Sequence, residues 1–485
     1  MLYDLNFLQR GQEFPPKSEV QRLDGYRVNN LLLNDEPWAA LPDYKKRVIY
    51  ILENFAIASE SIYLFTANYW ADLVNKTSEL IYGELPEISY TDDTTHAELV
   101  EMLEDINFFD KAKEGVSDFI SLGDWVTKVI EDKETNQWEF INVDPSTWFP
   151  IVSVENVKEI KMHVLAWIAT VGKKYELHVQ IHEKGKFSNR AFAIKDFNKD
   201  SYYVVESTNQ KIGCPTYEIG EELNKSGTDF KLGTFTTGLK DFAIIHSANN
   251  KTARNIYGSS DFDLITDAAM EYNVRQTLKD VVLDKHSSPI LYGPQLTDDR
   301  VGNYIEVPTG GQTPNYLVWD ASMQSVDNTI ERLKEDIANL SGLGSLLSSK
   351  TFGESQGYDA LMIKLSPALM RAAAKKRVLE PHLKKLIALL SAKNGKAILT
   401  KDITIMWHDG IPSTESAKAD VAQKHLNTGW SKKLVLVKDY GFTEEEAEAI
   451  IEDARLEQPA IAAFGYNEDE NEDNYEEEQP EQGGE

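Results

Sequence analysis

The stretch SVDNTIERLKEDIANLSGLGSLLSSKTFGESQG, residues 325–357, joins a one-sided helix pattern to a run of small residues. In its first half, apolar residues are spaced four, three, four and three positions apart, which is typical of a helix that packs along one face. They are Val326, Ile330, Leu333, Ile337 and Leu340, and the other faces carry Asp327, Glu331, Lys334 and Glu335. From Ser341 to Gly357, nine of seventeen residues are Gly or Ser. We interpret this run as a mobile loop, long enough in a compact domain to indicate a function.

A helix is predicted on each side of this stretch. Residues 261–285 contain no Gly or Pro, and their middle, EYNVRQTLKD, is polar on most sides. A monomer rarely builds such a helix into its own core, so we expect it to pack among copies of itself around a wet axis. Beyond the loop, residues 358–393 are leucine-rich but contain Pro367 and Pro381, where kinks or breaks are expected. Residues 287–319 indicate a short β-rich insert.

The N-terminal half mixes helical and strand patterns. Alternation of apolar and polar residues is strongest in YELHVQIH (175–182), within a predicted β-meander that covers residues 160–206. The stretch 207–240 is rich in turn residues and is not assigned. The other predictions are helices over 42–83, 97–106 and 108–120, strands over 125–130 and 138–143, a strand and turn over 403–412, and at least two short helices between 413 and 456.

His178 and His182 are the only close pair among the nine histidines. They alternate with apolar residues on a predicted strand, whereas a zinc protease places two histidines on a helix with a glutamate between them. We therefore expect both side chains to be solvated rather than to bind a metal.

The charge of the chain is strongly negative and unevenly spread. Of 485 residues, 50 are Lys or Arg and 79 are Asp or Glu, a net charge of −29, which argues against a protein that wraps duplex nucleic acid. Residues 467–485 hold ten acids and no Lys or Arg, as a disordered tail would. Residues 360–396 instead hold nine Lys or Arg and one acid, Glu380. We expect these cations to pair with acids on neighbouring elements, in preference to contacting phosphate.

Several classes of function lack support in the sequence. The single cysteine, Cys214, excludes a disulfide framework and a thiolate-rich metal site. No apolar run approaches the ~20 residues of a membrane span, and no signal peptide is recognised, so we expect a soluble protein made in a reducing cytoplasm. A phosphate-binding loop, a dinucleotide fingerprint, a nucleophile elbow and an EF-hand loop are all missing. We expect no catalytic residue, no cofactor and no metal.

Five phrases of the sequence, in their order and spacing, resemble the portal (connector) proteins of tailed bacteriophages, of the type found in long-tailed phages. Each phrase alone is unspecific, but together they cover most of residues 40–456. They are ANYWADLVNKTSELIYGELPEI (67–88), NVDPSTWFPI (142–151), NIYGSSDFDLI (255–265), SGLGSLLSSKTFGESQGYDALMIKL (341–365) and IMWHDGIPSTESAKADVAQKHLNTGWSKKLVL (405–436).

The resemblance implies an α+β portal fold: a wing of helices plus a β-meander, a two-helix stem, a small β-rich clip, a tunnel loop, a long kinked helix and a helical crown. The implied boundaries are 1–260 for the wing, 261–286 and 323–341 for the stem helices, 287–322 for the clip, 342–357 for the tunnel loop, 358–412 for the long kinked helix and a return strand of the wing, 413–456 for the crown and 457–485 for the acidic tail.

The resemblance also implies a function, that of a dodecameric ring at one capsid vertex. Double-stranded DNA passes through this ring non-specifically during packaging and ejection. The implied partners are the terminase large subunit, head-completion or adaptor proteins, and the major capsid and scaffolding proteins, with no membrane. The location is the virion, after assembly in the host cytoplasm. Candidates for the channel and tunnel loop are Ser348, Ser349, Lys350, Thr351, Lys334 and Lys364, and candidates for docking at the clip are Asp298, Asp299, Arg300 and Tyr304.

Two other functions remain open from the sequence. One is an acidic cytosolic scaffold or adaptor that recruits a basic partner through its tail. The other is a hydrolase whose acidic active-site residues are far apart in the sequence. Closed rings with a central hole would favour the portal function over both.

Overall fold

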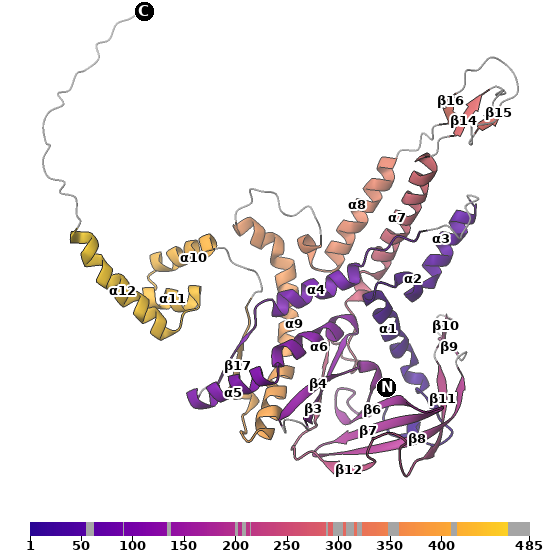
Figure 1. Cartoon of the computed structure of the whole chain (residues 1–485), viewed down its shortest axis with the longest axis horizontal. Coiled ribbons are helices and arrows are strands. Elements are labelled where there is room, and N and C mark those ends of the chain that lie inside the picture. The colour runs from indigo at the N-terminus through magenta and orange to yellow at the C-terminus, as the bar shows by residue number, and fades with distance from the viewer. Residues whose placement is uncertain are drawn as a thin grey trace, which may run out of the picture. The chain divides into compact units, whose positions relative to one another are not determined.

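The protein has two compact units, Met1–Gly410 and Ile411–Glu485. The computed structural model (Figure 1) describes residues 1–54, 63–90, 92–132, 137–198, 202–205, 210–213, 215–287, 290–293, 304–306, 315–317, 323–347, 358–408 and 415–463. Helices and strands are mixed within the first unit, in agreement with the α+β class expected.

Four helices begin the first unit: α1 (Lys17–Leu33), α2 (Pro37–Ala40), α3 (Pro42–Asn54) and α4 (Tyr69–Tyr82). The prediction of helix throughout 42–83 is wrong, because residues 63–68 form no helix. Asn68 starts α4 instead, since its side-chain oxygen accepts a hydrogen bond of 2.9 Å from the backbone N–H of Ala71. Asparagine favours this capping position because its side chain replaces the missing intrahelical acceptor.

Two helices and two small sheets follow. The helices are α5 (Asp93–Asp105) and α6 (Phe108–Ser121), close to the ranges predicted. The strands β3 (Asp124–Glu131) and β4 (Trp138–Val143) confirm the two predicted strands and pair antiparallel, and β13 (Ile244–Ala248) joins the free edge of β3. Far apart in the sequence, β2 (Glu87–Tyr90) and β17 (Ile403–Met406) form the other sheet.

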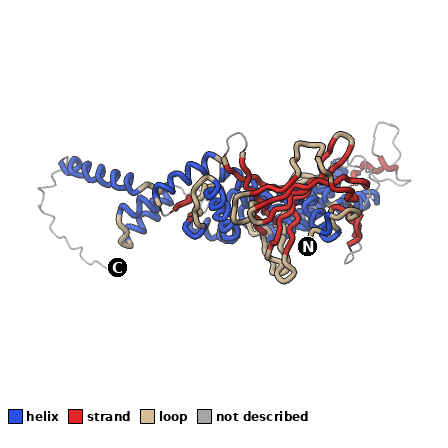
Figure 2. The backbone as a smooth tube through the Cα atoms, turned by 90° about the horizontal axis from the view of Figure 1, so that it is seen from below, coloured by secondary structure: helices blue, strands red, loops and turns tan. Residues whose placement is uncertain are grey.

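The largest sheet confirms the predicted meander. Its strand order is β1-β11-β8-β7-β6-β5, with β12 also paired to β8, and Figure 2 shows its long strands running side by side. The stretch left unassigned by the sequence supplies β11 and β12 to this sheet, and it also supplies β10, which pairs with β9 in a separate two-stranded sheet. The bounds are β1 (Glu13–Phe14), β5 (Trp148–Val152), β6 (Ile160–Val171), β7 (Lys174–Glu183), β8 (Lys186–Asn198), β9 (Tyr202–Val205), β10 (Gln210–Gly213), β11 (Thr216–Glu222) and β12 (Gly233–Thr236).

The expectation that His178 and His182 are solvated is wrong. They are 3% and 1% exposed, because other parts of the chain cover the second face of β7. The His178 ring stacks on Phe230 with 4.5 Å between ring centroids, and its Nε2 lies 3.1 Å from the Ser226 hydroxyl. Both covering residues belong to the stretch 207–240. Near His182, Lys128 of β3 donates a hydrogen bond to Gln180, so β3 adjoins the other end of this face.

Two helices, α7 (Thr266–Ser287) and α8 (Met323–Leu340), lie side by side (Figure 1). The insert between them confirms the predicted β character, with β14 (Ile290–Gly293) pairing with both β15 (Tyr304–Glu306) and β16 (Asn315–Leu317). The third long helix, α9 (Tyr358–Lys393), contains Pro367 and Pro381. Of the kinks or breaks expected at these prolines, a break occurs at neither, because α9 continues through both, and kinks stay a prediction. Buried leucines on both sides of Pro381 hold the helix in the core.

The second unit contains α10 (Glu415–Asn427), α11 (Lys432–Tyr440) and α12 (Glu444–Ala463), which confirms the helices predicted there. The His425 ring stacks on Trp430 at 4.2 Å and its Nδ1 lies 2.8 Å from the Asp439 carboxylate. Lys433 bridges Glu444 and Glu448 at 2.8 Å each, and so joins α11 to α12. The predicted disordered tail, 467–485, lies outside the described residues.

Candidate functional site

Two polar residues in the middle of α7 lie in the core of their own chain, and the expected packing of α7 among copies around a wet axis stays a prediction. Asn273 and Thr277 are fully buried, and so is the adjacent Val274. Their side-chain oxygens accept hydrogen bonds of 2.9 Å from the backbone N–H groups of Ala67 and Phe65. A buried backbone N–H needs an acceptor, and the segment before α4 has no strand or helix partner to provide one. Asn273 and Thr277 therefore serve as hydrogen-bond acceptors for a neighbouring backbone segment.

The helix α3 is tied to α7 by two polar contacts. Arg47 binds Glu271, with its two terminal nitrogens 2.7 and 3.3 Å from the carboxylate oxygens. Burial would raise the pKa of Glu271, but Arg47 and Arg275 hold it below its ordinary value. The Tyr44 hydroxyl donates to Asp267 at 3.0 Å, and burial together with this carboxylate raises the pKa of Tyr44 to about 12. These contacts fix the orientation of α7 on the helical layer.

The helix α8 has one apolar and one polar face. Ile330 and Ile337 are buried, and Val326 and Leu333 pack against the same core, as the heptad pattern predicted. Leu340 is 50% exposed, contrary to that pattern. A straight helix drifts by about 20° per heptad, so the stripe has turned away from the core at its last member, and Leu343 is buried beyond the end of the helix.

The opposite face of α8 is an exposed row of polar residues at helical spacing, which we name the polar stripe of α8: Ser325, Asn328, Thr329, Arg332, Glu335 and Asn339. The side chain of Arg332 is 82% exposed, and its Nε lies 3.9 Å from the Asp336 carboxylate. Sequence analysis missed Arg332. The heptad pattern contained the signal, since Arg332 lies two positions beyond Ile330 and five before Ile337, on the side away from the core.

Lys334, a predicted channel residue, lies nearer to α7. Its ammonium group is 3.2 Å from Glu331 and 5.9 Å from the ring centroid of Tyr272, and its side chain is 36% exposed. A second cation, Lys279 of α7, binds Asp327 of α8 at 2.6 Å. Both lysines therefore lie beside the contact between the two helices.

The described base of the predicted tunnel loop is anchored to the core. Leu343 is 1% exposed, and a short 3₁₀ turn, η5 (Gly344–Leu346), follows it. The Lys76 ammonium group donates a 2.6 Å hydrogen bond to the backbone carbonyl of Leu346 and also pairs with Asp72 at 2.9 Å. The chain therefore enters the predicted loop from a fixed position beside α4.

The remaining predicted site residues are only partly described. Lys364 lies on α9 with an exposed side chain. The backbone of Tyr304 begins β15 and pairs with Leu291. The others, Ser348, Ser349, Lys350, Thr351, Asp298, Asp299 and Arg300, lie outside the described residues.

Cations of the basic segment 360–396 pair with acids on neighbouring elements, as we expected from the sequence. Lys385 binds Asp241 at 2.9 Å, Lys396 binds Glu98 of α5, and Lys384 binds Glu380 within α9 at 2.7 Å. Lys376 is 7% exposed and donates a hydrogen bond of 2.5 Å to a backbone group, the carbonyl of His408.

Sequence analysis also missed a buried ionic cluster around Asp261, just before α7. Its carboxylate lies 2.6 Å from the Lys375 ammonium group and 3.0 Å from the Arg371 guanidinium group, both on α9. Asn249 and Asn250 donate hydrogen bonds to the second carboxylate oxygen. Burial would raise the pKa of Asp261, but the two cations hold it below its ordinary value. The cluster joins the start of α7, the end of β13 and α9.

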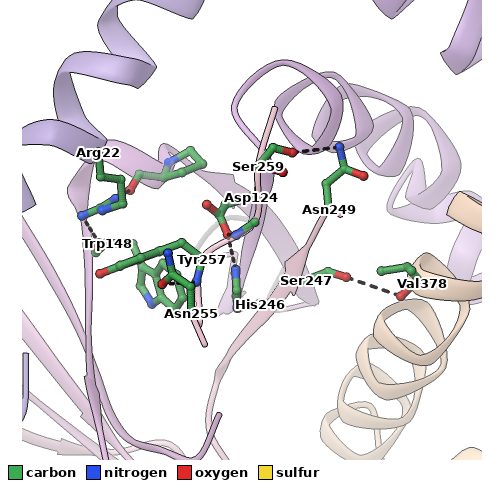
Figure 3. A network of polar contacts seen from close by, with 12 residues as sticks. Arg22, Asp124, Trp148, His246, Ser247, Asn249, Asn255, Tyr257, Ser259 and Val378 are labelled. Carbon is green, nitrogen blue, oxygen red and sulfur yellow. Dashed lines mark hydrogen bonds and ion pairs between the residues drawn. The ribbon is translucent and has the colours of Figure 1, made fainter. Parts of the chain in front are cut away.

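A second buried carboxylate, Asp124 at the start of β3, connects the sheets with α1. Figure 3 shows its contact with His246 of β13. It accepts hydrogen bonds from Tyr26 at 2.5 Å and from the Gly258 N–H at 3.0 Å, and its Oδ1 is 2.6 Å from His246. Burial would raise the pKa of Asp124, but these contacts keep it below its usual value. In the same view Ser247 points toward the Val378 carbonyl of α9.

Within each of these two clusters, the polar side chains form hydrogen bonds and ion pairs with one another. In the part of the chain that the structure describes, no three His, Cys, Asp or Glu side chains lie close enough together to hold a metal ion. Among the same residues, no helix is both long and apolar enough to span a membrane.

The comparisons with known proteins give one result. A family model described as "Phage portal protein, SPP1 Gp6-like" matches residues 64–460, from just before α4 into α12. No curated protein matches the chain. The family match covers more than half of the 485 residues and includes both α7 and α8. The chain therefore belongs to the SPP1 Gp6-like family of phage portal proteins.

Proposed function

We propose that this protein forms a dodecameric ring at one capsid vertex, through which double-stranded DNA is packaged and later ejected. Membership of the portal family implies a capsid-associated oligomer of the virion, which supports this proposal. The observation that carries it is the division of α8 into an apolar face, packed on its own chain, and an exposed polar stripe. One face builds the subunit and the other is free to line a channel.

The same proposal assigns a role in the portal to each of the remaining segments of the chain. Helices α7 and α8 form the stem, the strands of the insert 287–322 form the clip, and residues 342–357 form the tunnel loop. Residues 1–260 form the wing, 358–412 the long kinked helix and a return strand of the wing, and 413–456 the crown. The clip is the docking platform for the terminase large subunit and the head-tail connector proteins, with Asp298, Asp299, Arg300 and Tyr304 as its contacts.

The chemistry of the polar stripe of α8 suits a conduit that does not grip DNA. Duplex DNA carries one charge per ~1.7 Å, and each phosphate neutralised by a fixed cation adds affinity that slows movement. The stripe carries one cation, Arg332, with Glu335 in the next turn, so attraction and repulsion nearly cancel. Lys350 and Lys364 are the scattered cations that we propose to contact DNA transiently.

Native mass spectrometry with negative-stain electron microscopy tests the ring. Purified full-length protein is expected to give a closed ring with a central hole and a mass of twelve subunits. A monomer at micromolar concentration would contradict the proposal. A particle packaging assay then tests the loop cation: Lys350→Glu is expected to reduce the DNA packaged per particle more than Lys350→Ala, with Lys401→Glu as a control at a basic position in the return segment before β17. Packaging equal to wild type in both Lys350 variants would remove Lys350 from the mechanism.

A further inference from the structure

An open apolar groove of about 630 Å³ lies between β2, α5 and α6. Its floor is formed by Ile88, Leu103 and Phe108, which are 7%, 4% and 1% exposed. Figure 1 shows α5 beside the two-stranded sheet of β2 and β17. The volume is within the range of about 300–1,000 Å³ that is typical of binding sites, so the groove can receive several side chains of a partner. We name it the β2 groove.

The β2 groove follows one edge of β2. Five consecutive residues line it, 85–89, of which the last three belong to the strand. Successive side chains of a strand point to opposite faces, so a groove that touches all of these residues runs along the backbone edge. On its other edge β2 pairs with β17, and among the described strands it has no second partner. A free strand edge presents N–H and C=O groups with which another strand can pair.

The rim of the β2 groove is acidic. Glu87, Glu104 and Asp110 line it with exposed side chains, and none of its described lining residues is Lys or Arg. Glu87 lies 3.6 Å from a ring nitrogen of His408, whereas Glu104 and Asp110 form no ion pair within the described part of the chain. An apolar floor with unpaired carboxylates around it is complementary to a segment that carries both apolar and basic side chains.

The acids at the end of α5 do not stabilise that helix. Glu101, Glu104 and Asp105 lie in its last five residues, which contain no Lys or Arg. The C-terminus of a helix carries a partial negative charge, which favours cations and disfavours carboxylates. A cation bound at this end of the β2 groove is therefore attracted by the carboxylates and by the helix terminus together.

We infer that the β2 groove binds an extended basic segment of a partner protein, which adds to β2 as a third strand. Backbone pairing with β2 holds the segment, and its alternate side chains enter the groove above Leu103 and Phe108. The remaining side chains are Lys or Arg and face Glu104 and Asp110. The rim repels an acidic segment and the phosphates of DNA. The groove belongs to a single subunit, so this binding does not require the proposed ring.

Fluorescence anisotropy tests this inference with the full-length chain and a short labelled peptide of alternating valine and lysine. A double variant, Glu104→Lys with Asp110→Lys, reverses the rim, and Val100→Trp fills the groove without changing the charge, because Val100 also lines it. The control is Glu155→Lys with Glu159→Lys, which changes the charge equally at two exposed acids outside the groove. Circular dichroism and thermal unfolding establish that each variant is folded.

Two modified peptides test the added strand. Neighbouring residues of a strand direct their N–H groups to opposite edges, so methylation of the valine nitrogens and methylation of the lysine nitrogens remove opposite rows of donors. Only one of the two methylated peptides is expected to lose binding. Equal binding of both, or loss of binding by both, would show that no strand forms on β2 and overturns the inference.

We expect the rim and filling variants to bind the unmodified peptide at least about tenfold more weakly than wild type, as loss of a central contact does, while the control binds like wild type. Equal weakening in the rim and control variants would mean that the peptide responds to the overall charge of the chain. That result overturns the inference, and so does the absence of binding to wild type. Binding to the monomer but not to the assembled chain would mean that a second copy fills the groove, which also contradicts it. A chain that stays monomeric and binds the peptide overturns the proposed ring but supports this inference.

Discussion

The Asp261 carboxylate and the Lys375 ammonium group form a buried ion pair, with 2.6 Å between Oδ2 and Nζ. Asp261 is completely buried, and the Lys375 side chain is 5% exposed. Asp261 precedes α7, and Lys375 lies more than a hundred positions later in α9. The pair therefore joins the start of the helix that we assign to the stem to the long helix beyond the predicted loop.

Asp261→Ala is expected to lower the free energy of unfolding by about 3–5 kcal/mol, because it leaves Lys375 and Arg371 buried without a counter-charge. Asp43→Ala is the control, since Asp43 pairs with Lys46 on the surface, where both side chains are more than 70% exposed. Urea unfolding followed by circular dichroism measures both. Similar midpoints for the two variants would show that the buried pair does not hold α7 to α9.

Three buried histidines are expected to make the fold sensitive to mild acid. Burial lowers the pKa of His163 and His382 well below the ordinary value, and burial near Lys128 lowers that of His182 to about 3. The unfolded chain therefore binds more protons than the folded chain below about pH 6.5, and stability falls as the pH falls from there toward 3. Asp118 opposes this trend, because burial near Asp144 raises its pKa to about 7.

The contribution of one histidine can be isolated with His182→Gln. Each buried neutral histidine adds about 1.4 kcal/mol per pH unit to the slope of stability against pH in this range. His182→Gln should flatten the slope between pH 6 and pH 4 by about that amount, whatever Asp118 contributes. Urea midpoints at several pH values provide the measurement. A slope equal to that of wild type would mean that His182 is protonated in the folded chain.

Two glycines in helices are expected to respond oppositely to alanine. A Cβ at Gly115 would collide with the ring of Trp125, which is fully buried and stacks on His382 at 4.1 Å. Gly115→Ala should therefore cost about 1–3 kcal/mol through overpacking. A Cβ at Gly25 in α1 meets no atom within 4 Å, so Gly25→Ala should add up to about 1 kcal/mol from helix propensity. Thermal unfolding distinguishes the two, and stabilisation by both would contradict the packing of Trp125.

Asn273→Ala is expected to cost about 1–3 kcal/mol, because it leaves the backbone N–H of Ala67 without its acceptor. The matched change Asn328→Ala lies on the polar stripe of α8 and should alter stability little. Denaturant unfolding of both variants checks this prediction. Equal effects would mean that the segment before α4 does not depend on α7.

The sequence predicted the elements whose signal is periodic. The heptad spacing of Val326, Ile330 and Leu333 identified α8 and its buried face, and strict alternation identified β7 within the meander. Contacts between distant residues have no such signal. Asn273 in the sequence looks like a solvated position, and only the path of residues 63–68 beside α7 makes it a buried acceptor. His178 likewise became buried because a stretch with no periodicity folds over β7.

The same reason explains what was predicted of the site. Lys334 was named as a channel candidate from the resemblance to portal proteins, yet a rotation of about 200° separates it from Arg332 around the helix. The structure places Lys334 near Tyr272 of α7 and Arg332 on the exposed face. Deciding whether Lys334 or Arg332 lies on the exposed face requires the position of α7. The local sequence pattern of α8 does not give that position.

A cryo-electron microscopy map of the assembled full-length chain is the most direct measurement, because it locates α8 relative to the symmetry axis. We expect a closed ring in which the polar stripe of α8, with Asn328 and Arg332, faces the central hole. A ring with this stripe on its outer wall or between subunits, or a chain that stays monomeric, would contradict the assignment of α8 as the channel wall.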